Sequence, residues 1–260
     1  MATALVTGAT AGIGLSLAQQ LAGHGHDLIL VARNADRLAD TANGIHRQFG
    51  VTVATMPADL ANRSDVDRVA ARLADTAAPV EWLINNAGFG VREPFAHSDL
   101  AAEQAMLDVL VTAPMRLTHA ALPGMLERGR GRVLVVSSMA SFLPSGTYSA
   151  AKAWATVFSE SLSAQYRHRG VHVTALCPGY THTEFHERAD MDVSGISEWM
   201  WLNADAVAES GLLACEEGRA IAVPGLVYKG LGLLTTVLPR PVLRRVLRAG
   251  SGGLREGSTK

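Results

Sequence analysis

Residues 3–14, TALVTGATAGIG, place a glycine-rich turn directly after a short apolar strand and directly before a helix. Glycine permits the backbone conformations and the close backbone approach that such a turn requires. The following helix would present free N–H groups and the positive end of its dipole to an anion. This placement predicts a dinucleotide-binding turn, in which the residues on the pyrophosphate side are Gly8, Thr10, Gly12, Ile13 and Gly14.

The end of the second expected strand, Val31-Ala32-Arg33, bears on which dinucleotide is bound. An acidic residue at this place would hold a ribose 2′-hydroxyl and favour NAD. The chain has Ala32 there, and Arg33 can form charge-assisted hydrogen bonds to a 2′-phosphate, each worth about 1.5–3 kcal/mol. We therefore expect NADP(H) in preference to NAD(H). The alternative is that Arg33 is a solvated side chain at the start of a helix.

Short apolar runs alternate with helix-length amphipathic segments along most of the chain. This alternation predicts a single-domain α/β Rossmann fold, with a doubly wound, seven-stranded parallel sheet flanked by helices. The expected strands are Thr3–Thr7, Asp27–Ala32, Val51–Pro57, Trp82–Asn85, Gly131–Ser137, His172–Cys177 and Ala220–Val223. The expected helices include Ile13–Gly23, Arg63–Asp75, Ala101–Arg128, Tyr148–Arg169 and Ala204–Glu217.

Tyr148 and Lys152 form a Tyr-x-x-x-Lys pair within one of these expected helices. Residues four apart share a helix face, so the Lys152 ammonium can reach toward the Tyr148 phenol. A free tyrosine titrates near pH ~10, and a nearby cation lowers that pKa toward the range useful for proton transfer. The pair is therefore a candidate proton donor. On its own it would read as a partly buried Tyr and a surface Lys.

The motifs together resemble the classical short-chain dehydrogenase/reductase family, and the resemblance covers essentially the whole chain. The matching residues are Thr7–Gly14, Asp59-Leu60, Asn86–Gly88, Ser137-Ser138, Tyr148–Lys152, and Pro178-Gly179 with Thr181 and Thr183. Val223-Pro224-Gly225 further resembles a bacterial subgroup of ketone or acyl-chain reductases. The resemblance implies an oxidoreductase that transfers hydride between a nicotinamide and a carbonyl or alcohol carbon.

The resemblance also implies a role for each matching residue. Ser138 would hydrogen-bond the substrate oxygen, Tyr148 would exchange the proton, and Lys152 would lower the Tyr148 pKa and bind the nicotinamide ribose. Asp59 and Leu60 would lie at the adenine, although Asp59 can equally cap a helix. The other residues that the resemblance places around the cofactor are Asn86, Ala87, Gly88, Pro178, Gly179, Thr181 and Thr183.

The chain departs from the family pattern at two places near the expected proton path. Leu110 stands where the family usually has an Asn that supports a water relay to the lysine, and a Leu side chain cannot hydrogen-bond. The backbone carbonyl of Leu110 can hold the water only if the helix kinks there. Ser138 and Tyr148 are also closer in sequence than is common in the family. Proton-transfer steps are worth ~10²–10⁴-fold, so activity could be weakened within that range.

Two functions remain open from the sequence. The first is an NADP(H)-dependent oxidoreductase acting on an apolar ketone, a secondary alcohol or a 3-oxoacyl substrate. The second is a catalytically impaired NADP(H)-binding sensor or scaffold, which Leu110 favours. The apolar substrate is suggested by the residues Phe89, Phe95, Phe142, Leu143, Phe185 and Trp199–Trp201, although residues of these types are also ordinary in a protein core.

Composition limits the remaining classes. A net charge of −1 gives no general attraction to nucleic acid, the two cysteines suggest no metal site or disulfide framework, and nothing at the start resembles a signal peptide. We expect a cytoplasmic domain over residues 1–238, with a substrate lid at about residues 180–203, in a homodimer or homotetramer. Residues 239–260 form a basic tail that more often docks on protein than on a membrane.

Overall fold

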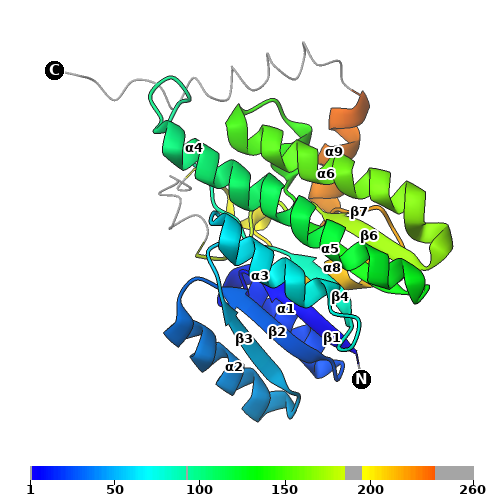
Figure 1. Ribbon diagram of the computed structural model, residues 1–260. Coiled ribbons are helices and arrows are strands. Elements are labelled where there is room, and N and C mark those ends of the chain that lie inside the picture. Colours follow the sequence, from blue (N-terminus) through cyan, green and yellow to red (C-terminus); the bar gives the residue numbers. More distant parts are fainter. Residues whose placement is uncertain (1, 92, 185–194, 238–260) are drawn as a thin grey trace.

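The computed structural model describes residues 2–91, 93–184 and 195–237, and these form one seven-stranded, fully parallel sheet (Figure 1). The strand order is β3-β2-β1-β4-β5-β6-β7, so the chain reverses direction across the sheet between β1 and β4. The fold predicted from the sequence is confirmed. The strands are β1 (Thr3–Thr7), β2 (Asp27–Ala32), β3 (Val53–Pro57), β4 (Val80–Asn85), β5 (Gly131–Val136), β6 (Val171–Leu176) and β7 (Ile221–Ala222).

Helices cover both faces of the sheet. Figure 1 shows α3, α5 and α6 in front of the strands, with α1 and α8 behind. The helices are α1 (Gly12–Gly23), α2 (Ala35–Phe49), α3 (Arg63–Ala74), α4 (Leu100–Leu107), α5 (Ala113–Glu127), α6 (Gly146–Tyr166), α8 (Ala204–Glu216) and α9 (Leu226–Val237). Short 3₁₀ turns are η2 (Met139–Phe142), η3 (Arg167–Arg169) and η4 (Glu198–Met200).

The central strands are buried on both sides, which explains why their sequences are apolar throughout rather than alternating. In β4, Trp82 and Ile84 pack in the core under α1, α2 and α8, whereas Leu83 between them packs in the core under α3, α5 and α6. Successive side chains of a strand point to opposite faces, so one apolar run supplies both cores. No helix in the described ranges is long and apolar enough to cross a membrane.

The long helix expected at Ala101–Arg128 is interrupted by a π-helical turn, η1 (Asp108–Thr112). The backbone N–H of Ala113 donates to the carbonyl of Asp108, five residues earlier. Proline at position 114 explains the wider turn. An α-helix would pair the Leu110 carbonyl with the N–H of residue 114, and Pro114 has no N–H to donate. The helix therefore departs from α geometry around Leu110. Such a departure is what the Leu110 backbone carbonyl would need in order to hold a water molecule.

Other differences from the predicted elements are smaller. Strand β3 begins at Val53 rather than Val51, and the sequence reading named no helix at 226–237, where Gly230 and Gly232 weaken the helical pattern. Part of the expected lid, residues 185–194, and the basic tail from residue 239 onward lie outside the described residues. Both assignments therefore stay predictions.

Gly170→Ala should cost clearly more stability than Gly50→Ala, although both glycines have positive φ, +78° and +72°. A Cβ on Gly170 would lie 1.9 Å from the Gly129 carbonyl oxygen, whereas one on Gly50 meets nothing within 4 Å. The left-handed conformation alone costs a non-glycine residue roughly 1–2 kcal/mol. Chemical denaturation should therefore show a loss of about that size for Gly50→Ala and a larger one for Gly170→Ala. Equal losses would contradict the close contact between the β5 and β6 entry turns.

Candidate active site

The glycine-rich turn lies at the carboxyl end of β1 and has the close backbone packing expected of a phosphate-binding turn. Gly8 and Gly12 have φ of +65° and +53°, conformations that favour glycine. A Cβ on Gly14 would lie 2.3 Å from the Gly8 carbonyl oxygen. Helix α1 begins after Ala11, and no side chain caps its first N–H groups. Because those donors have no side-chain partner, the turn fits the diphosphate of a dinucleotide.

Asn86 fastens this turn to the neighbouring strand β4. Its side-chain amide donates to the carbonyls of Thr7 and Gly8 at 2.9 and 3.1 Å. The Thr7 hydroxyl in turn accepts the backbone N–H groups of Asn86 and Ala87 at 3.0 and 3.1 Å. The side chain of Asn86 therefore holds the glycine-rich turn in place through hydrogen bonds to its backbone. Thr7 supports the same turn, a role that the sequence analysis did not assign to it.

The three predicted catalytic residues meet at the carboxyl ends of β5 and β6. Ser138 follows β5, and its hydroxyl accepts the N–H of Ala140 at 3.1 Å, so it also caps η2. The hydroxyls of Ser138 and Tyr148 are hydrogen-bonded to each other. Tyr148 and Lys152 lie in the first two turns of α6, with the Lys152 ammonium 5.6 Å from the centre of the Tyr148 ring. The shorter Ser–Tyr spacing therefore does not prevent the two hydroxyls from meeting.

The pKa of Tyr148 moves opposite to the expected direction. Burial of the phenol raises its pKa, and the hydrogen bond with Ser138 offsets only part of that rise. The Lys152 ammonium instead donates to the Val136 carbonyl oxygen at 2.7 Å. Burial thus dominates the Tyr148 pKa, and the role of Lys152 in lowering it stays a prediction from the resemblance. Burial also lowers the pKa of Lys152 to about 8, so a smaller fraction of this side chain is protonated near neutral pH than for an exposed lysine.

Apolar residues explain why the phenol is desolvated. Met106, Leu110 and Ala151 form a small buried cluster, against which Tyr148 packs together with Phe89 and Val91. A Cβ on Gly88 would lie 2.8 Å from the Leu110 Cδ2 atom and 3.8 Å from the Lys152 Nζ atom. The Leu110 side chain therefore stands beside the lysine, at the place expected for the polar relay residue.

The Pro178-Gly179 turn after β6 borders the same site. The Pro178 carbonyl accepts the N–H of Met139, which links the turn to η2. A Cβ on Gly179 would lie 2.0 Å from the Tyr228 ring, and the Tyr228 hydroxyl donates to Met200 and accepts the N–H of Tyr180. Tyr228 of α9 thus holds the turn and the start of the expected lid together. No short motif marks it, so sequence reasoning missed it.

Thr181 and Thr183 have different neighbours in the structure. Thr181 is buried and pairs with Leu202 in an isolated parallel bridge, so both ends of the expected lid meet there. Thr183 lies against the glycine-rich turn: a Cβ on Gly12 would be 2.8 Å from the Thr183 methyl carbon. Thr183 therefore packs against the predicted diphosphate turn, and its place at the nicotinamide end stays a prediction.

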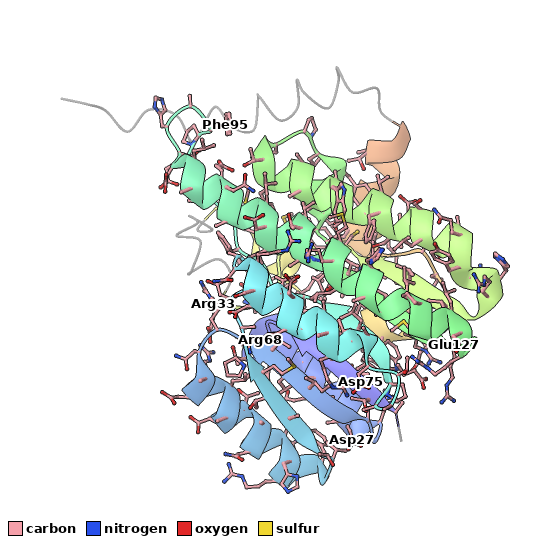
Figure 2. The ribbon with its side chains drawn as sticks, viewed as in Figure 1. Asp27, Arg33, Arg68, Asp75, Phe95 and Glu127 are labelled. Carbon is pink, nitrogen blue, oxygen red and sulfur yellow. The ribbon has the colours of Figure 1, made fainter. Side chains whose placement is uncertain are left out.

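Three of the remaining predicted cofactor residues, Arg33, Asp59 and Leu60, follow strands β2 and β3. Arg33 is exposed immediately before Asn34, the N-cap of α2, and Figure 2 shows it at the outline of the molecule. Asp59 accepts the N–H of Ala61 in a local turn, while Asn62 caps α3. Leu60 is a buried core residue. Thr10 and Ile13 are partly buried in the turn and in the first turn of α1.

Among the expected apolar substrate residues, only Phe89 packs near Tyr148 in a core cluster. Phe95 and Trp199 are 66% and 67% exposed, and Phe185 lies outside the described residues. The described residues include no group of three or more His, Cys, Asp or Glu side chains able to hold a metal ion. The Ser138 and Tyr148 hydroxyls can exchange a proton with an oxygen atom bound beside them.

Proteins named as reductases are among those that this chain resembles. The ketoacyl reductase HetN of Nostoc sp. is 33% identical over 181 residues, covering 68% of this chain and 63% of that protein. The very-long-chain 3-oxoacyl-CoA reductase of Anas platyrhynchos is 35% identical over 191 residues, covering 70% of this chain and 61% of that protein. The matches thus span less than two thirds of these relatives.

A solved structure matches over the full length. The short-chain dehydrogenase from Sphingobium yanoikuyae in complex with NADPH has a TM-score of 0.82 at 28% identity, covering 100% of this chain and 99% of that one. The family model described as short chain dehydrogenase matches residues 2–193, a range that includes both the glycine-rich turn and the Tyr148–Lys152 helix turn. The chain therefore belongs to the short-chain dehydrogenase/reductase family.

Proposed function

We propose that this protein is an NADP(H)-dependent oxidoreductase that acts on an apolar ketone, a secondary alcohol or a 3-oxoacyl substrate. One observation carries the proposal: the hydrogen-bonded Ser138–Tyr148 pair and Lys152 lie at the carboxyl ends of β5 and β6, in the same sheet as the glycine-rich turn. Two reductases of 3-oxoacyl or ketoacyl substrates among the relatives, and NADPH in a similar solved structure, support it.

The bound nicotinamide supplies or accepts the hydride, and the residues of the chain handle the substrate oxygen and its proton. Ser138 hydrogen-bonds that oxygen and orients it, while Tyr148 exchanges a proton with it. Gly8, Gly12 and Gly14 would hold the diphosphate, and Lys152 the nicotinamide ribose. When charged, Lys152 also favours the phenolate form of Tyr148.

Restoring the Tyr148 proton requires a route that does not use the Leu110 side chain. The Leu110 carbonyl lacks its ordinary α-helical donor because residue 114 is proline, so it is a ready acceptor for a water molecule. We propose that this backbone group takes the part of the absent amide side chain.

The second candidate function, a weakly active NADP(H)-binding sensor or scaffold, is favoured by the apolar surroundings and raised pKa of Tyr148.

The homodimer or homotetramer and the cytoplasmic location stay predictions from the sequence.

Arg33→Ala should weaken NADPH binding about 10- to 100-fold and leave NADH binding nearly unchanged. The loss corresponds to one charge-assisted contact with a 2′-phosphate, about 1.5–3 kcal/mol. Fluorescence titration of both cofactors measures it. Arg47→Ala is the matched control, because Arg47 is an exposed arginine in the last turn of α2, at the end of that helix away from Arg33. Equal weakening of NADPH and NADH would show that Arg33 does not read the phosphate.

The wild-type protein should oxidise NADPH with an apolar ketone or 3-oxoacyl panel, and Tyr148→Phe should lower kcat ~10²–10⁴-fold without loss of NADPH binding.

If the Leu110 backbone serves the relay, Leu110→Asn should change kcat by less than about tenfold. Leu107→Asn, on the more exposed helix surface, controls for the substitution itself. NADPH binding without turnover until Leu110→Asn would instead support the sensor or scaffold.

Lys152 should make stability rise with pH in a way that Lys152→Met abolishes. Between its folded pKa of about 8 and its unfolded pKa near 10.5, the unfolded chain holds a proton that the folded chain does not. Raising the pH through this window therefore stabilises the fold, by up to about 3 kcal/mol. Urea unfolding of both proteins at pH 7.5, 8.5 and 9.5 measures the difference. The free energy of unfolding of the wild type minus that of Lys152→Met should rise with pH. A difference that stays constant or falls would mean that Lys152 is not buried as described.

A further inference from the structure

The segment after Pro178-Gly179 runs across the carboxyl ends of the strands toward helix α2. Thr183 lies on Gly12 of the glycine-rich turn, and Glu184 forms an ion pair with Arg37 in the first turn of α2. The pair is two-pronged: Arg37 Nη1 donates to Glu184 Oε2 at 3.1 Å, and Nη2 donates to Oε1. These contacts join parts of the chain 147 residues apart.

The sheet order shows what lies beneath this crossing. Residue 178 follows β6, whereas Arg37 follows β2, and β5, β4 and β1 lie between these two strands. The segment therefore spans the carboxyl ends of the central strands, including the switch point between β1 and β4, where doubly wound sheets bind their ligands. The Arg37–Glu184 pair is the far anchor of this crossing.

We propose that the Arg37–Glu184 pair is a clasp that holds the 178–184 segment over the dinucleotide and slows its release. The proposal rests on the dinucleotide binding given above and adds two positioning residues that no motif marks. Neither side chain needs to touch the cofactor, because each acts by holding the other. Their side chains are 42% and 41% exposed, so solvent screens the attraction and the effect on release is modest.

Three physical accounts make different predictions for the two single substitutions. A clasp predicts that Arg37→Ala and Glu184→Ala both speed release, and to the same extent for NADPH and NADH. A general electrostatic effect on an anionic cofactor predicts opposite signs, because one substitution removes a positive charge and the other a negative charge. A direct contact of Arg37 with the 2′-phosphate predicts an effect on NADPH alone.

The test is stopped-flow release of NADPH and NADH, followed by the loss of bound-cofactor fluorescence after dilution into competing oxidised cofactor. Arg37→Ala and Glu184→Ala should each raise koff about two- to fivefold for both cofactors. The double variant should release no faster than the faster single variant, because the two residues form one contact. Exchanging the charges, Arg37→Glu with Glu184→Arg, should restore slow release.

Asp67→Ala is the matched control, since it removes a carboxylate from another ion pair between helices, Arg116–Asp67, outside this crossing. Its koff should equal that of the wild type. Opposite signs for the two single variants, an effect confined to NADPH, or unchanged release in both would overturn the clasp while leaving cofactor binding established. Failure of the wild type to bind either cofactor would overturn the proposed function and the clasp together.

Discussion

The hydrogen bonds that join Thr7, Gly8 and Asn86 hold together the point on which the rest of the site depends. They link the carboxyl ends of β1 and β4, two neighbouring strands that are far apart in sequence. The strand order reverses its direction across the sheet between these strands, which is where doubly wound sheets bind their ligands. Fixing both strand ends sets the shape of the glycine-rich turn before any ligand arrives. The backbone of the two strand ends therefore forms the site, and the Thr7 and Asn86 side chains hold that backbone in place.

The proposed catalytic group is placed in conflicting surroundings. Ser138, Tyr148 and Lys152 are polar, yet Met106, Leu110 and Ala151 surround the phenol with apolar side chains. Desolvation raises the pKa of Tyr148 and lowers that of Lys152 to about 8, so burial shifts both equilibria toward the neutral forms. A negatively charged cofactor beside Lys152 would favour the ammonium, and through it the phenolate. The proposed cofactor binding and proton transfer would then be coupled through the charge state of Lys152.

The π-helical turn and the crossing of residues 178–184 illustrate a shared theme. In each, a local feature depends on a residue elsewhere in the chain: Pro114 offers no N–H to the Leu110 carbonyl, and Glu184 pairs with Arg37 of α2. Tyr228 does the same for the Pro178-Gly179 turn. Functional contacts of this kind gather at the carboxyl edge of the sheet because the connecting segments converge there.

The sequence by itself determined the fold class, most strand positions and the three residues that meet at the proposed catalytic centre. Apolar runs buried on both faces and glycines between strand and helix have local causes, so they can be read from neighbouring residues. Only the tertiary structure decided the direction of the Tyr148 pKa, the place of Thr183 on Gly12, and the partners of Arg37 and Tyr228. Desolvation and long-range pairing depend on which distant side chains surround a group, and no local pattern records them.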